Sequence, residues 1–163
     1  YYKYREVAVM ERYGFDPTLT KKEGIEVIYL AGGCFWGMEK LMSRLPGTVD
    51  VVSGYANGTT QNTPTYDAVC RGGTGFKETV RVEYNPQKIS LEIILNAFFT
   101  AIDPTLKNQQ GNDIGSQYQT GVYYSDNSAS KIVEKYVAAQ KEKHDIFEVN
   151  EALFYFGQPT IGV

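Results

Sequence analysis

The fold is decided by residues 25–56, which read IEVIYLAGGCFWGMEKLMSRLPGTVDVVSGYA. The stretch opens on a β-branched, mostly apolar run over 25–31 that is typical of a buried strand. Two glycines end this run, and apolar residues then recur at helical spacing over 34–45 until Pro46-Gly47 stops the helix. A second strand is predicted over 48–56. The strand–helix–strand order indicates that the two strands run parallel.

The rest of the chain continues this alternation of strands and helices. We expect a strand at 76–84, a helix at 91–101 with Ser90 as its N-cap, a polar loop at 103–117, a strand at 120–124 and a helix at 128–143. Two successive β-α-β units predict an α+β two-layer sandwich with a ferredoxin-like split βαβ core, and we expect its sheet to be mixed.

Three segments are predicted along the chain. Residues 1–24 are expected to form an N-terminal extension, in which a weak apolar stripe predicts a short helix ending near Gly14. Residues 25–145 are expected to form the domain that carries the catalytic residues. Residues 146–163 are expected to form a tail that no local pattern places.

Composition narrows the classes of function. A chain of 163 residues with a net charge of −3 fits one domain and argues against a nucleic-acid partner. The longest strongly apolar uncharged run, 27–38, is too short to span a membrane. Two cysteines and one histidine argue against a metal cage or a disulfide-rich scaffold. The first residues lack the apolar block of a signal peptide, so we expect a cytoplasmic protein.

Cys34 is the leading candidate for a catalytic residue. It follows two glycines at the end of the first strand and opens the predicted helix, where free N–H groups and the helix dipole favour a thiolate. Phe35 and Trp36 beside it suit a substrate with a small apolar group at the reacting atom. The alternative, a small buried cysteine at a tight corner, fits the residues equally well.

A proton donor other than histidine is needed for such a thiol. His144 lies in a charged stretch and is expected to be solvated. Glu78 shares a strand face with Val80 and Val82, so we expect it to point inward, where a carboxyl group without a partner keeps its proton near neutral pH. The alternative is a structural glutamate paired with Arg71 or Arg81.

Three further side chains could complete the site. Asp113 lies in the polar loop, where a turn-forming aspartate is the alternative. Tyr66 and Tyr118 could donate hydrogen bonds, although core packing is the usual role of a tyrosine in so tyrosine-rich a chain. A thiolate, a protonated carboxyl and phenols together suit attack on a polarised X=O bond.

An ordered set of short motifs runs over about Ile25 to Lys143. The motifs are Gly33-Cys34-Phe35-Trp36-Gly37, Leu45-Pro46-Gly47, Ser53-Gly54-Tyr55, Pro64-Thr65-Tyr66, Gly75 with Glu78, Asp103-Pro104, and Gln110-Gly111-Asn112-Asp113 with Gly115, Gln117 and Tyr118. This set is similar to that of the A-type peptide methionine sulfoxide reductases. The resemblance implies the same α/β sandwich and reduction of methionine S-sulfoxide, free or in proteins.

The resemblance also implies a role for each candidate. Cys34 would attack the sulfur of the sulfoxide and become a sulfenic acid. Glu78 would protonate the oxygen, with Tyr66 and Tyr118 bonding to it, and Asp113 would help to organise the site. Phe35 and Trp36 would bind the methyl group of the substrate. No bound cofactor or metal is implied, and an external thiol such as thioredoxin, glutaredoxin or glutathione would regenerate the enzyme.

The sequence departs from the family at three places. Phe76 stands where a histidine is usual, Gln119 stands where an arginine is usual, and the segment after residue 145 lacks the family's His-Gln-Asp-Tyr-like stretch and cysteine-bearing tail. Either Cys70 resolves the sulfenic acid or an outside thiol does so directly. We expect Cys70 to be a structural thiol, so an outside thiol would reduce Cys34. A sulfoxide-binding or peptide-binding module with impaired catalysis and a thiol peroxidase remain as alternative functions.

Overall fold

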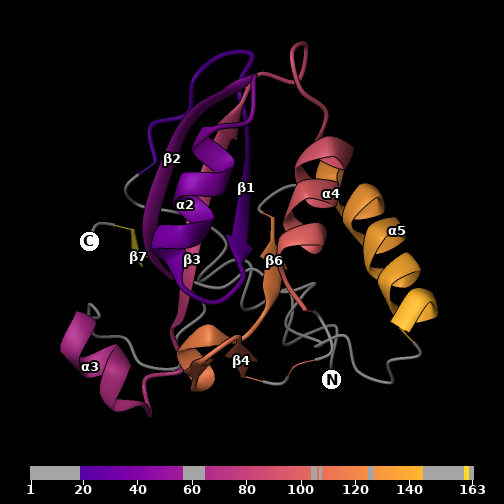
Figure 1. Cartoon of the computed structure of the whole chain (residues 1–163). Helices are drawn as coiled ribbons and strands as arrows, with labels where there is room; N and C mark the ends of the chain where they lie inside the picture. Colours follow the sequence, from indigo (N-terminus) through magenta and orange to yellow (C-terminus); the bar gives the residue numbers. More distant parts are fainter. Residues whose placement is uncertain are drawn as a thin grey trace, which may run out of the picture.

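A five-stranded sheet forms the centre of the molecule. The computed structural model describes residues 19–56, 65–103, 106, 108–124, 127–144 and 160–161. The strands follow the order β6-β1-β3-β2-β7, and each neighbouring pair is antiparallel (Figure 1). They are β1 (Glu26–Ala31), β2 (Thr48–Ala56), β3 (Lys77–Tyr84), β6 (Gly121–Tyr123) and β7 (Thr160–Ile161).

The strand order confirms the ferredoxin-like split βαβ core and corrects one expectation. Strands β1 and β2 both run antiparallel to β3 and therefore parallel to each other, as predicted. However, β3 lies between them, so no described ladder is parallel and the prediction of a mixed sheet is wrong. The helical crossover leaves a gap one strand wide, and β3 fills it.

Four helices and one short hairpin complete the described fold. The helices are α2 (Phe35–Ser43), α3 (Tyr66–Arg71), α4 (Leu91–Ala101) and α5 (Asn127–His144). The predicted loop at 103–117 instead contains a hairpin, β4 (Gln109–Gln110) and β5 (Asp113–Ile114), and the start of a 3-10 turn, η1 (Ser116–Tyr118). Ser90 caps α4 as predicted, because its hydroxyl accepts the N–H of Ile93 at 3.3 Å.

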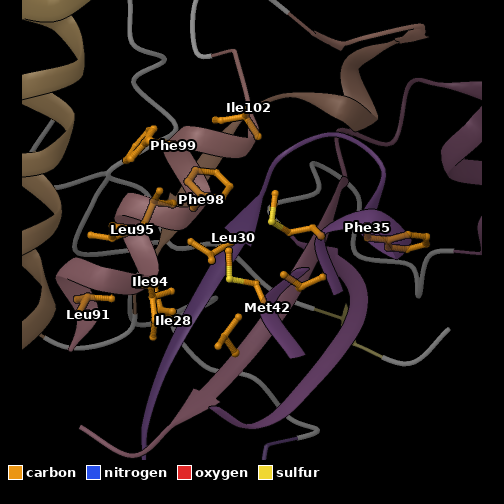
Figure 2. Close-up of a cluster of buried hydrophobic side chains, with 14 of the residues drawn as sticks. Ile28, Leu30, Phe35, Met42, Leu91, Ile94, Leu95, Phe98, Phe99 and Ile102 are labelled. Carbon is orange, nitrogen blue, oxygen red and sulfur yellow. The ribbon is translucent and has the colours of Figure 1, made fainter. Parts of the chain in front are cut away.

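The main core lies between the sheet and helices α2 and α4. Figure 2 shows that side chains of β1 and α2 meet the inner face of α4. The fully buried members labelled there are Ile28, Leu30, Phe35, Met42, Ile94, Leu95 and Phe98. Each such side chain contributes roughly 1.5–3 kcal/mol by leaving water. This core fixes the start of α2, and with it the corner that carries Cys34.

The opposite face of the sheet is buried as well. Tyr29 and Ala31 of β1 pack there with Ala56 and Tyr123 in a second, smaller cluster. Burial on both faces explains why β1 is continuously apolar from Val27 to Ala31 rather than alternating. Within the described ranges no helix is long and apolar enough to cross a membrane. The predicted helix near Gly14 lies outside the described residues.

Candidate active site

Cys34 lies at a corner whose shape depends on glycine. It is the N-cap of α2, yet its side chain makes no capping hydrogen bond, so the thiol is not engaged by the helix. The preceding Gly33 has φ +86°, and a Cβ there would lie 2.6 Å from the Cβ of Gln110 in β4. Only glycine meets both demands without strain. The β4–β5 hairpin therefore packs directly against the corner that carries the thiol.

Glu78 points inward from β3, as its strand alternation predicted, and is only 3% exposed. Its carboxyl accepts a hydrogen bond of 3.2 Å from the backbone N–H of Phe35, the first residue of α2. Burial raises the pKa of Glu78 to about 7; the Phe35 N–H opposes this rise and the charge of Asp113 adds to it. Near neutral pH a large fraction of Glu78 is therefore a protonated acid.

The two arginines considered as structural partners of Glu78 make other contacts. The Nε of Arg81 lies 3.6 Å from the carboxylate of Glu83, on the opposite face of β3. The Nε of Arg71 donates to the backbone carbonyl of Asp67 at 3.2 Å. The interpretation of Glu78 as half of a structural ion pair therefore has no support in these contacts.

Two phenols and a second carboxyl gather around Glu78. Tyr66, at the start of α3, has its pKa raised chiefly by a hydrogen bond with Cys70, and less by the charge of Glu78. Burial raises the pKa of Tyr118 to about 12, and the charges of Glu78 and Asp113 add to the rise. The structure thus brings side chains from β3, α3, β5 and η1 close enough for their charges to interact, and their roles in the reaction stay predictions.

Aromatic rings line the approach to Cys34. Trp36 stacks on Tyr66 with ring centroids 6.0 Å apart and an interplanar angle of 22°. Trp36 is 56% exposed and Tyr66 is 42% exposed, so this stack is open to solvent. Phe35 lies against Trp36 at 5.3 Å but is only 1% exposed. Trp36 therefore presents an accessible apolar surface, and Phe35 supports it from within the core.

Two residues near the site were not recognised as such from the sequence. Tyr55 of β2 lies directly opposite Glu78 in the β2–β3 ladder, and its ring is 5.5 Å from that of Phe35. The alternation along β2 places Tyr55 with Val51 on the core face, which is the signal that could have found it. Cys70 is exposed and lies against Tyr66, and its role as a structural thiol stays a prediction.

The departures from the family pattern fall in different surroundings. Phe76 is 2% exposed and belongs to the main core, whereas Gln119 follows η1 as its C-cap residue. The tail after residue 145 was not placed from the sequence, and of it the structure describes only β7. This strand pairs Thr160 with Tyr55 and thereby reaches the strand next to Glu78.

Comparison with known proteins gives one consistent answer. Residues 26–154 match the model of the peptide methionine sulfoxide reductase family. The peptide methionine sulfoxide reductase MsrA of Alkaliphilus metalliredigens is 48% identical over 124 residues, covering 76% of this chain and 78% of the relative. The MsrA of Clostridium acetobutylicum is 42% identical over 126 residues, covering 77% of each chain.

Solved structures agree with the sequence relatives. Methionine sulfoxide reductase A of Corynebacterium diphtheriae superposes with a TM-score of 0.73 at 33% identity, over 86% of this chain and 68% of that one. Mxr1 from Saccharomyces cerevisiae in its reduced form also gives 0.73, at 30% identity, over 91% of this chain and 83% of that one. The chain therefore belongs to the peptide methionine sulfoxide reductase family, and its activity is the thiol-dependent reduction of methionine sulfoxide.

Proposed function

We propose that the chain reduces the S epimer of methionine sulfoxide, free or in a polypeptide, with Cys34 as nucleophile and Glu78 as acid. The Cys34 thiolate attacks the sulfoxide sulfur, and Glu78 gives its proton to the oxygen. The S=O bond breaks, the oxygen passes to Cys34 as a sulfenic acid, and methionine and the Glu78 carboxylate remain. The sulfoxide sulfur gains the electron pair that the cysteine sulfur loses.

The observation that carries this proposal is the shared position of thiol and acid. Cys34 is the N-cap of α2, and Glu78 bonds to the first N–H of the same helix. The pKa of Glu78, raised by burial to about 7, lets it donate a proton at neutral pH. Tyr66 and Tyr118 supply phenol donors for the departing oxygen, while Asp113 acts through its charge on Glu78 and Tyr118.

The substrate's methyl group is proposed to contact Trp36. The indole ring is more than half exposed and is held by its stack on Tyr66. Phe35 is almost wholly buried, so its contribution to substrate binding is to support the indole ring rather than to offer surface. An apolar contact beside a polarised oxygen would select a sulfoxide that carries a small alkyl group.

Regeneration is proposed to use an external thiol of the thioredoxin, glutaredoxin or glutathione type. Cys34 and Cys70 are the two cysteines of the sequence, and both are free thiols. Cys70 is engaged in a hydrogen bond with Tyr66. One external thiol would form a mixed disulfide with Cys34 and release water, and a second would restore the Cys34 thiol. A reaction cycle that needs a free Cys34 thiol favours a cytoplasmic location, where thiols are kept reduced.

A stereospecific turnover assay tests the proposed function. The wild-type chain should form methionine from the S-sulfoxide but not from the R-sulfoxide, with each of the three reductants supplied in turn. Cys34→Ser should abolish turnover because serine cannot form the sulfenic acid, whereas Cys70→Ser should retain it. Binding of the S-sulfoxide without turnover would indicate a binding module. Consumption of peroxide without consumption of sulfoxide would indicate a thiol peroxidase.

A further inference from the structure

We propose that Tyr55 is a positioning residue for the acid. Its hydroxyl donates a hydrogen bond to the Glu78 carboxylate that forms when Glu78 has given its proton to the substrate. The inference rests on the proposed function of Glu78. It adds to the site a third phenol, which acts on the acid rather than on the substrate.

The strand register places the two side chains together. Tyr55 and Glu78 are directly opposed in the antiparallel β2–β3 ladder. Such opposed residues point to the same face, with Cβ atoms about 4.5–5.5 Å apart. Phe35 then contacts both residues, because its backbone N–H bonds to Glu78 while its ring lies 5.5 Å from the ring of Tyr55. One residue of α2 therefore holds the acid and the phenol on the same side of the sheet.

The Tyr55 hydroxyl is available to donate a hydrogen bond during the reaction. Tyr55 is 3% exposed, and within the described part of the chain its hydroxyl has no hydrogen-bond partner. A buried hydroxyl without a partner is unfavourable, and phenylalanine would fill the same space at less cost. The unpartnered hydroxyl therefore points to an acceptor that forms during the reaction. The Glu78 carboxylate is such an acceptor, because ionised oxygens need more donors than the single Phe35 N–H.

The other ionisable groups around Glu78 cannot take this role as well. These groups, from the elements packed against it, are Cys34, Tyr66, Cys70, Asp113 and Tyr118. Asp113 repels a second carboxylate, Tyr66 is solvent-exposed, and Tyr118 is already proposed as a donor to the departing oxygen. Burial, and then the charge of Glu78, raise the pKa of Tyr55, so its phenol keeps its proton over the working range. Tyr55 is therefore the donor that is most deeply buried.

Tyr55→Phe tests the proposal because it removes only the hydroxyl. We expect the limiting rate of sulfoxide reduction to fall by roughly tenfold, the size of one hydrogen bond to a charged group. Without that bond the pKa of Glu78 rises, so the loss of activity at alkaline pH should move upward by about one pH unit. The thermal unfolding midpoint should stay unchanged or rise, because an unpaired buried hydroxyl has been removed. Unchanged rate and pH profile would overturn the proposal.

A matched control and a second measurement keep the outcome clear. Tyr123→Phe removes a buried tyrosine hydroxyl on the opposite face of the sheet and should leave both rate and pH profile unchanged. Direct titration of Glu78 by NMR, with carbon-13 in its carboxyl group, should show a higher pKa in Tyr55→Phe than in the wild type. If the pKa of Glu78 is higher in Tyr55→Phe but the wild type does not reduce the sulfoxide, the proposed function is rejected and the Tyr55–Glu78 hydrogen bond is supported. If the wild type reduces the sulfoxide but the pKa of Glu78 is the same in both proteins, only the hydrogen bond is rejected.

Discussion

The deep half of the site and its rim are built in opposite ways. The deep half, formed by Glu78, Tyr55 and Phe35, is no more than 3% exposed and is held by strand pairing and by the start of α2. At the rim Trp36 and Tyr66 are stacked in solvent, and Cys70 is exposed beside them. Burial is what moves the pKa of a carboxyl group, whereas exposure is what admits a substrate. We therefore expect deep substitutions to change the chemical step and rim substitutions to change binding.

The largest effect is expected from Glu78→Gln in the deep half. Glutamine keeps the size and the contact with the Phe35 N–H but cannot donate the proton, so kcat should fall about a hundredfold or more. Steady-state assays with the S-sulfoxide measure this. Glu83→Gln, on the same strand but the opposite face, is the matched control and should keep kcat. A normal rate in Glu78→Gln would remove the acid from the mechanism.

The same variant should show how ionisation of the buried Glu78 changes the free energy of unfolding. The folded chain keeps the Glu78 proton up to about pH 7, whereas the unfolded chain releases it near the ordinary value of 4.5. The wild type should therefore lose stability relative to Glu78→Gln as pH rises between these values. The difference should level off above pH 7 at on the order of 3 kcal/mol. Chemical denaturation of both proteins from pH 4 to 8 measures it, and a flat difference would mean that Glu78 titrates normally.

At the rim, Trp36→Ala should weaken substrate binding. Loss of one apolar contact should raise KM by about tenfold and leave kcat nearly unchanged. Trp36→Phe keeps an aromatic surface beside Tyr66 and should recover most of the binding. A fall in kcat with KM unchanged would instead place Trp36 with the deep half.

The smallest effect is expected from Cys70→Ser. If an external thiol reduces Cys34 directly, turnover should change by less than about threefold, through the altered bond to Tyr66 alone. Mass spectrometry of the oxidised wild type should then show a Cys34 sulfenic acid or its adduct with the added thiol. A Cys34–Cys70 disulfide would contradict direct regeneration and make this rim residue part of the reaction cycle.

Local pattern alone predicted most of the elements. The alternation over 76–84 and the Ser90 cap before α4 predicted those elements to within a residue, because strand pleat and helix capping depend on near neighbours. The same alternation showed that Glu78 points inward. Two glycines before a helix start predicted that Cys34 lies at the corner between the first strand and the helix. These features of the site belong to the sequence itself.

Contacts between distant segments were decided by the tertiary structure. The insertion of β3 between β1 and β2 replaced the expected parallel pairing of these strands with two antiparallel ladders. The same pairing of β2 with β3 places Tyr55 directly opposite Glu78, so the two buried side chains are neighbours. Local sequence pattern likewise could not predict that Cys70 is exposed or that β7 pairs with β2 at Tyr55. Periodicity shows which face of a strand is buried, but the partner across the ladder depends on register, and register is set only when the whole sheet packs.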